Sequence, residues 1–364
     1  METESFELKI IDVVEETVDA HSITFEVPEG QEESFAYRPG QFLTIAVPSD
    51  QTGVAARCYS LSSSPAAGGP LTITVKRTAE GYASNWVCDN LREGDTVRVL
   101  APSGIFTPAS LDADLLLFAG GSGITPVISI TRTALARGSG RIVLFYANRD
   151  ESSVIFAREV TELATAHPER LHVVHWLESV QGLPSPEQMK AFAAGHPTYD
   201  AFVCGPPPFM KMTIAALKEL GFPRERRHQE KFISLGGNPF GDLHDVEVAR
   251  SEISAAESDE QDAATEAADA ARGHVRLRVE LDGEQHEFDD WTRNVKLLDF
   301  LESKGVKAPY SCREGECSAC AIRLLDGEVR MLHNDVLDDE DLAEGIRLGC
   351  QSLPVTDAVD VSYS

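Results

Sequence analysis

Basic residues are scarce in this sequence, which has 32 Lys and Arg against 59 Asp and Glu and a formal net charge of −27. Nucleic acids and anionic membrane surfaces are themselves negatively charged, so this balance argues against binding to either. The excess of acidic residues is compatible with a partner that has a basic face, although a solvated acidic surface needs no partner at all.

Long apolar runs are absent too, since a stretch such as Leu115–Ala119 is far shorter than a membrane span. The first residues, Met1 to Glu7, contain neither a basic segment nor an apolar core, so we expect no signal peptide. The seven cysteines lack the even spacing of a small secreted disulfide framework, and the ten histidines form no evident metal cluster. These absences predict a cytoplasmic protein in a reducing compartment.

Four of the cysteines are concentrated toward the carboxyl end. Cys312, Cys317 and Cys320 form a C-x4-C-x2-C run, and Cys350 follows at a distance. This is the ligand spacing of a plant-type two-iron, two-sulfur cluster, and Gly315 permits the sharp turns of such a loop. A structural zinc site is the alternative, but zinc sites usually divide their ligands into two C-x2-C pairs. We therefore predict a 2Fe-2S cluster, which passes single electrons.

Residues 1–108 are dominated by short alternating stretches between Gly and Pro turns. The expected strands are Phe6–Val13, Ser22–Val27, Gln41–Val47, Leu71–Lys76 and Thr96–Leu100. Such a pattern is typical of an antiparallel β-barrel. One helix, Ser84–Leu91, is expected within it.

Two motifs in this segment have the residue types of a ligand site. Arg57-Cys-Tyr-Ser60 offers a cation, an aromatic ring and a hydroxyl, and in an extended segment its first and third residues share a face. The stretch Lys76–Asn85 contains Gly81 and Ser84 at a helix start, where backbone amides would be available to an anion. Taken alone, each motif is better explained as an ordinary strand surface or helix cap.

From residue 111 to residue 240, strands alternate with helices. The expected strands are Leu115–Ala119, Arg141–Tyr146, Leu171–Trp176 and Ala201–Cys204, and the expected helices are Ile124–Arg137, Ser153–Ala166, Pro186–Ala194 and Phe209–Leu220. This alternation predicts an α/β domain whose parallel sheet is covered on both faces. Ligands then bind at the carboxyl ends of the strands. Two of these ends are glycine-rich, Ala119–Pro126 and Cys204–Met210, although a glycine turn after a strand is weak evidence alone.

The last segment, residues 273–364, follows an acidic, alanine-rich stretch. Residues 245–272 have nine Asp and Glu, nine Ala and no aromatic residue, which is typical of a solvated tether or an inert spacer. Beyond it we expect strands at Val275–Leu281, Gln285–Phe288, Ala321–Leu325, Val329–Met331 and Ala358–Ser362, with helices at Val295–Lys304 and Asp338–Leu342. This order predicts an α+β domain of the β-grasp type. Ser311, Arg313 and Ser318 either donate hydrogen bonds to cluster sulfurs or complete the backbone bonding of the loop.

In combination, these motifs resemble the ferredoxin–NADP reductase superfamily, with a flavin domain followed by a nicotinamide domain. The resemblance implies FAD and a nicotinamide nucleotide as cofactors. It assigns flavin binding to Arg57, Tyr59, Ser60, Lys76, Gly81, Ser84 and Asn85, and nucleotide binding to Gly121, Gly123, Thr125, Gly205 and Pro206.

Four residues are expected at the contact between flavin and nicotinamide by the same resemblance: Ser60, Thr125, Cys204 and Glu230. For Cys204 the alternative is a buried strand residue. Phe232 is expected against the flavin, although a core position is equally compatible.

The choice between NADH and NADPH depends on the residues after the second strand of the α/β domain, where the adenosine ribose is bound in such folds. Arg149 would suit a 2′-phosphate and Asp150 would suit a 2′-hydroxyl, so these two residues favour opposite cofactors. The overall resemblance favours NADH.

The domain order flavin, nicotinamide and ferredoxin resembles the phenylacetate-type reductase components of bacterial oxygenases. Among these components, the sequence resembles the reductases of 3-ketosteroid 9α-hydroxylases on the stretches Arg57–Pro65, Val75–Gly81, Tyr146–Asp150 and Val174–Pro184. The resemblance implies an NADH-dependent oxidoreductase that passes electrons through FAD and the 2Fe-2S cluster to a terminal Rieske oxygenase of steroid breakdown. Three alternatives stay open: a reductase of another oxygenase such as phenylacetyl-CoA epoxidase, a zinc-stapled binding module without catalysis, and a free-standing flavin reductase.

Overall fold

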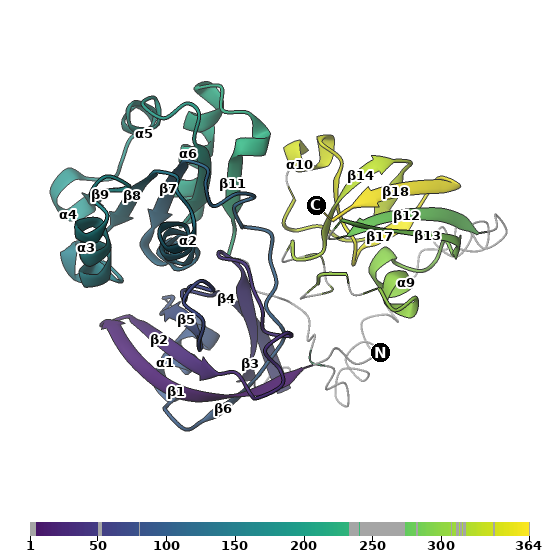
Figure 1. Ribbon diagram of the computed structural model, residues 1–364, viewed down its shortest axis with the longest axis horizontal. Helices are drawn as coiled ribbons and strands as arrows, with labels where there is room; N and C mark the ends of the chain where they lie inside the picture. The colour runs from purple at the N-terminus through teal and green to yellow at the C-terminus, as the bar shows by residue number, and fades with distance from the viewer. Residues whose placement is uncertain are drawn as a thin grey trace.

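The computed structural model describes residues 5–49, 53–79, 81–232, 240, 274–281, 283–306, 308–310, 313, 315, 318–337 and 339–363. They form three units, each built on its own sheet (Figure 1). The acidic stretch expected as a linker at 245–272, and the residues Ser311, Cys312 and Cys317, lie outside the described residues. Within the described ranges, no helix combines the length and the apolar character that crossing a membrane requires.

The first unit is a six-stranded antiparallel sheet in the order β4-β3-β6-β1-β2-β5. Its strands are β1 (Phe6–Thr17), β2 (Ala20–Glu26), β3 (Phe42–Ser49), β4 (Gly53–Ser60), β5 (Leu71–Lys76) and β6 (Thr96–Val99). Leu61, directly after β4, forms a bridge to Ile73 of β5, so the two edge strands meet and the sheet closes. Helix α1 (Tyr82–Asn90) packs Val87 and Cys88 against the enclosed core. The predicted β-barrel is confirmed.

The second unit is a five-stranded parallel sheet in the order β11-β10-β7-β8-β9. Its strands are β7 (Leu115–Gly120), β8 (Ile142–Asn148), β9 (Leu171–Leu177), β10 (Asp200–Cys204) and β11 (Arg227–Glu230), and its helices are α2 (Ile124–Arg137), α3 (Ala157–Ala166), α4 (Glu178–Gln181), α5 (Pro186–Ala193) and α6 (Pro207–Glu219). All six residues of β7 are buried, because α2 packs on one face of the sheet while α5 and α6 pack on the other. The predicted α/β architecture is confirmed.

The third unit is a mixed sheet in the order β13-β12-β18-β14-β16, in which β12 and β18 run parallel. Its elements are β12 (Val275–Leu281), β13 (Glu284–Trp291), α9 (Leu297–Ser303), β14 (Ala321–Asp326), β15 (Val329–Met331), α10 (Asp339–Ala343), β16 (Ile346–Leu348), β17 (Ser352–Pro354) and β18 (Ala358–Ser362). Helix α9 packs Leu298 and Leu301 on the sheet beside the fully buried Trp291. This is the predicted β-grasp arrangement.

Four strands were not predicted: β4, β11, β16 and β17. They are short or carry polar residues at buried-side positions, as in the Arg-His-Gln-Glu sequence of β11, and pairing with a neighbouring strand gives them their conformation. Helix α3 begins at Ala157 rather than at Ser153. The reason is that Asp150 caps a separate 3-10 turn, Glu151–Ser153, through a complete capping box.

Helix α2 joins the first unit to the second. Its Ser129 hydroxyl donates to the backbone carbonyl of Ser63 at 2.6 Å, and the Thr133 and Ser64 hydroxyls lie 2.9 Å apart. The Arg132 guanidinium, which is paired with Glu159, also donates to the Ser62 carbonyl. Because these bonds connect a helix of one unit to a loop of the other, the junction between the two is fixed.

Candidate functional site

The two glycine-rich loops meet at the carboxyl ends of β7 and β10. A Cβ atom on Gly123 would lie 2.1 Å from the carbonyl oxygen of Cys204 and 2.7 Å from the amide nitrogen of Gly205. A Cβ atom on Gly120 would lie 2.9 Å from Cδ of Pro206. Only glycine permits backbones to approach this closely. The two loops are therefore packed into one surface, as the sequence predicts for a single nucleotide site.

Cys204 and Glu230 lie side by side at the end of the sheet, because β10 and β11 pair in a register that sets these residues opposite each other. Cys204 is fully buried and Glu230 is 8% exposed. Burial raises the pKa of the Glu230 carboxyl from 4.5 to about 8, and burial followed by the nearby Glu230 charge raises the pKa of the Cys204 thiol. At neutral pH the pair is a thiol and a carboxylic acid.

Two further residues predicted for this site are Thr125 and Phe232. Thr125, in the first turn of α2, is buried, and its hydroxyl donates to the Ser122 carbonyl at 3.1 Å. Phe232 lies two residues beyond the end of β11 and is 49% exposed. The core alternative for Phe232 is therefore wrong, and its ring is available to a flat ligand.

The Arg57–Ser60 motif forms the last half of β4, which confirms the extended conformation expected for it. Tyr59 pairs with Leu43 and Arg57 with Ile45, both of which are fully buried, so these side chains share a face with the barrel core. Burial raises the pKa of the Tyr59 phenol, which stays protonated as a hydrogen-bond donor. Ser60 is 3% exposed.

The turn before α1 is held by the two predicted polar side chains. The Thr78 amide donates to the Ser84 hydroxyl at 3.0 Å, and the Asn85 amide group donates to the carbonyls of Thr78 and Gly81 at 3.0 and 2.6 Å. Among the residues that the structure covers, no side chain caps α1 at Gly81. Ser84 and Asn85 thus shape the turn, and the first amides of α1 are left for an anionic group.

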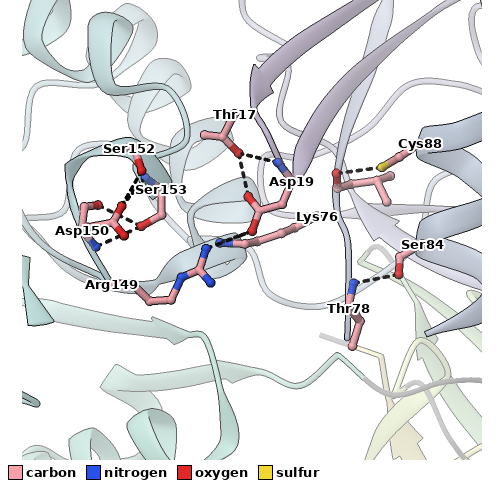
Figure 2. Close-up of polar contacts among 11 residues, drawn as sticks. Thr17, Asp19, Lys76, Thr78, Ser84, Cys88, Arg149, Asp150, Ser152 and Ser153 are labelled. Atoms are coloured by element: carbon pink, nitrogen blue, oxygen red, sulfur yellow. Dashed lines mark hydrogen bonds and ion pairs between the residues drawn. The ribbon is translucent and has the colours of Figure 1, made fainter. Parts of the chain in front are cut away.

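A cationic cluster lies where the first two units meet (Figure 2). The Asp19 carboxylate, in the turn after β1, lies 3.2 Å from the Arg149 guanidinium and 3.7 Å from the Lys76 ammonium. The Thr17 hydroxyl donates to the same carboxylate at 2.8 Å. A Cβ atom on Gly121 would lie 3.9 Å from Nζ of Lys76. Lys76, Arg149 and the first glycine loop are therefore assembled around Asp19, a residue that sequence reasoning missed.

Asp150 has a local structural role. Its carboxylate accepts from the Ser152 hydroxyl at 2.7 Å and from the Ser153 amide at 3.0 Å (Figure 2). These hydrogen bonds, the Ser152 bond foremost, lower the pKa of Asp150. A carboxylate that caps its own turn is less suited to a ribose hydroxyl than the sequence expectation assumed.

The two described cluster cysteines, Cys320 and Cys350, are both 2% exposed and adjacent, with the Cys350 amide 3.4 Å from the Cys320 sulfur. The side-chain amide of Gln351 donates to the Cys350 sulfur at 3.8 Å and to the Arg313 backbone carbonyl at 2.6 Å. Amide donors to cysteine sulfurs suit a 2Fe-2S cluster, because hydrogen bonds to the sulfurs help to set its reduction potential. Gly315 has φ +82°, and a Cβ there would lie 2.8 Å from the His333 carbonyl oxygen, as expected for a sharp turn that needs glycine.

Arg313 connects the cysteine loop to helix α9. Its guanidinium pairs with Asp299 at 3.2 Å and with Glu302, and it lies over the Tyr310 ring at 4.2 Å. The carboxylates of α9 thus hold the side chain as a brace between the cysteine loop and α9. Its Nε is buried without a hydrogen-bond partner among the described residues, so a donor role toward the cluster stays a prediction.

Tyr363, like Gln351, has a position that sequence reasoning missed. Its hydroxyl is buried without a hydrogen-bond partner among the described residues, and a Cβ on Gly349 would lie 2.8 Å from it. Burial first, and then the nearby Cys320 and Cys350 charges, raise its pKa. No sequence signal points to this tyrosine, because only the end of β18 brings it beside the cluster ligands.

Three family models match the chain. They are the oxidoreductase FAD-binding domain over residues 7–107, the oxidoreductase NAD-binding domain over residues 117–214 and the 2Fe-2S iron-sulfur cluster binding domain over residues 279–355. These matches confirm the predicted FAD, nicotinamide nucleotide and 2Fe-2S cluster, and with them an oxidoreductase.

Similar proteins align over nearly the whole chain. A 3-ketosteroid-9-alpha-monooxygenase ferredoxin reductase component of Rhodococcus rhodochrous is 54% identical, over 98% of this chain and 96% of its own length. One subunit of the 1,2-phenylacetyl-CoA epoxidase of Escherichia coli is 31% identical, over 98% of this chain and 97% of its own length. The structure of phthalate dioxygenase reductase, 24% identical, superposes with a TM-score of 0.55 over 98% of both chains and supports the fold.

We expect Gly123→Ala to raise the KM for NADH by roughly tenfold or more, because the added methyl group forces the two glycine loops apart and misplaces the ligand. The assay is NADH oxidation with ferricyanide as acceptor. Gly195→Ala is the matched control, since a Cβ at Gly195 meets nothing within 4 Å. An unchanged KM in a folded Gly123→Ala protein would contradict the single-surface interpretation.

Glu230→Gln tests the buried carboxylic acid. In the fold Glu230 holds its proton up to about pH 8, whereas its ordinary pKa is 4.5, so the wild type loses unfolding free energy as pH rises between these values. Glutamine has no such proton to lose. The Tm of Glu230→Gln relative to the wild type should therefore rise as the pH is raised from about 5 to about 8. A pH-independent difference would show that Glu230 is ionised in the fold.

Proposed function

The chain belongs to the family of three-domain ferredoxin reductases that includes the reductase component of 3-ketosteroid-9-alpha-monooxygenase, and from this premise we propose that it drives the terminal Rieske oxygenase of steroid 9α-hydroxylation. Electrons pass from NADH through FAD and the 2Fe-2S cluster to that partner. The 54% identity to the Rhodococcus relative, against 31% to the epoxidase component, supports the steroid system over phenylacetyl-CoA epoxidation.

One contact carries the proposal of a relay within a single chain. The Lys231 ammonium donates to the Val336 carbonyl at 2.9 Å, which joins the residue after Glu230 to the unit that contains the cluster cysteines. A zinc-stapled binding module or a free-standing flavin reductase has no need for this contact. The domain boundaries we propose are 1–108, 111–240, 245–272 and 273–364.

Positioning is the task that remains for the protein, because FAD supplies hydride acceptance and the cluster supplies one-electron transfer when they are bound. We assign the flavin ring to Arg57, Tyr59 and Ser60, and the flavin pyrophosphate to the amides that follow Gly81. Burial raises the pKa of Tyr59, so its phenol O–H is available to donate a hydrogen bond to the flavin.

At the nucleotide end, the contacting loops of Gly123 and Gly205 receive the ligand and Thr125 fixes the first turn of α2. Cys204 supplies an uncharged, water-excluding surface. Glu230 holds a proton beside it at neutral pH, which avoids a buried negative charge next to the reacting rings.

NADH is the proposed donor because Asp19 partly neutralises Arg149 at the carboxyl end of β8, where the adenosine ribose of such folds is bound. The carboxylate would also repel a 2′-phosphate. The cytoplasmic location is likewise a proposal, supported by Cys58, Cys88 and Cys204, which form no disulfide in the described part of the chain.

Cys320→Ser tests the relay. We expect it to lose the visible absorbance of the cluster and the delivery of electrons to the oxygenase, while NADH still bleaches the flavin anaerobically. Cys88→Ser makes the same chemical change in the barrel core and should keep the cluster. Full delivery without a cluster would refute the relay, and a colourless wild-type protein that contains zinc would favour the binding module.

Asp19→Asn tests the choice of nucleotide. Removing a charge near 4 Å in a solvated site changes an interaction by about 1 kcal/mol, so the KM for NADPH should fall roughly fivefold while that for NADH changes less. Steady-state kinetics with both nucleotides measure the ratio. Asp89→Asn, which breaks an exposed pair with Arg77 in the same unit, is the control. If both KM values change equally, Asp19 plays no part in the choice.

A further inference from the structure

The ferredoxin unit rests on the nicotinamide unit through the acidic helix α10, which lies beside β11 (Figure 1). We call Glu340, Asp341 and Glu344 the acidic face, and Lys218, Arg224 and Arg227 the basic edge. The Glu340 carboxylate pairs with both Lys218 and Arg227, the latter at 2.8 Å. Arg224 pairs with Asp341 and lies 3.7 Å from Glu344.

One partner of the Arg227–Glu340 pair and one partner of the Arg224–Asp341 pair are buried where the units meet. Arg227 is 6% exposed and Asp341 is 7% exposed. Hydrogen bonds from Arg227 and then from Lys218 hold the pKa of Glu340 at about 2, so this carboxylate is charged at every physiological pH. Arg227 also donates to the Phe222 carbonyl of its own unit at 3.0 Å, which keeps its guanidinium in place at the basic edge.

Such an interface is suited to repeated opening. Part of the attraction between the charges is offset by the cost of removing them from water, which reduces the net free energy needed to separate them into solvent. Since the charges regain water on opening, the balance between the two states depends on ionic strength. A large apolar interface would lack both properties.

The contact also sets which side of the ferredoxin unit faces the nucleotide site. Val336 accepts from Lys231, the neighbour of Glu230. The nearby Asp335 amide donates to the Gly315 carbonyl of the cysteine loop at 3.2 Å. The segment that touches the nicotinamide unit is therefore the one that supports the cluster loop, and the docked arrangement faces the electron donor.

We propose that the acidic face of α10 is a shared docking surface. In the closed chain it binds the basic edge and holds the cluster for transfer from the flavin. After release it binds a basic patch on the oxygenase, so one set of carboxylates is used in turn by the internal donor and by the external acceptor. This inference rests on the proposed relay, and charge complementarity defines the partner surface.

The test uses the full-length holoprotein, two single charge variants, their double variant and one control variant. Lys218→Glu weakens the internal dock but leaves the acidic face intact. Anaerobic stopped flow should show cluster bleaching slowed roughly threefold to tenfold at low ionic strength, with the difference lost near 1 M salt. The KM for the oxygenase should fall, because the acidic face is more often open. Lys190→Glu, whose partner Glu219 belongs to the same unit, is the control and should match the wild type.

Glu340→Lys reverses charge on the acidic face itself, so it should slow cluster bleaching and raise the KM for the oxygenase. The double variant Lys218→Glu/Glu340→Lys should bleach its cluster faster than Glu340→Lys alone, although more slowly than the wild type because Arg227 still faces the new lysine, and its KM should stay raised. Restoration of both would overturn the shared surface, and unchanged bleaching in both single variants would overturn the dock. Flavin bleaching by NADH is recorded in the same traces. If the proposed relay itself were wrong, the flavin would bleach but the cluster would stay oxidised in the wild type and in every variant.

Discussion

The parallel register of β7, β10 and β11 is the constraint on which the rest of the molecule depends. It brings Gly123 against the Cys204 carbonyl and sets Cys204 opposite Glu230. It also ends β11 so that Lys231 reaches the ferredoxin unit. A shift of this register by one residue would turn Glu230 to the other face of the sheet and remove its neighbour from the dock. Nucleotide site, buried acid and cluster docking are thus consequences of one set of backbone hydrogen bonds.

Charged and ionisable groups behave differently inside a unit and at the junctions between units. Glu230 is buried without a charged partner among the described residues, and burial keeps its carboxyl neutral at neutral pH. Where opposite charges meet across a junction, as at Asp19 with Arg149 and at Glu340 with Arg227, the strength of the contact depends on salt. The net charge of −27 is therefore not only a solvated surface, because part of it lies at internal interfaces.

Strand periodicity and cysteine spacing are local signals, and they were sufficient for the three units and the 2Fe-2S cluster. The resemblance to known reductases supplied FAD and the nicotinamide nucleotide, since the glycine turns alone are weak evidence. The sequence was insufficient where distant segments meet. In the sequence, Asp19 has the pattern of an ordinary turn residue and α10 that of a solvated acidic helix, and Tyr363 has no signal at all. Only the packing of the units shows which groups they contact. The brace that Arg313 forms was missed for the same reason, since the carboxylates that pair with it belong to α9. Strand β11 was missed because its four polar residues have no strand pattern of their own.

An anaerobic titration of the holoprotein with NADH tests the central claim, a relay from nucleotide to flavin to cluster in one chain. A flavin accepts two electrons and the cluster accepts one. We therefore expect the absorbance of both to bleach, with an end point at about 1.5 equivalents of NADH. An end point near about one equivalent, with the flavin bleached and the cluster still oxidised, would contradict it.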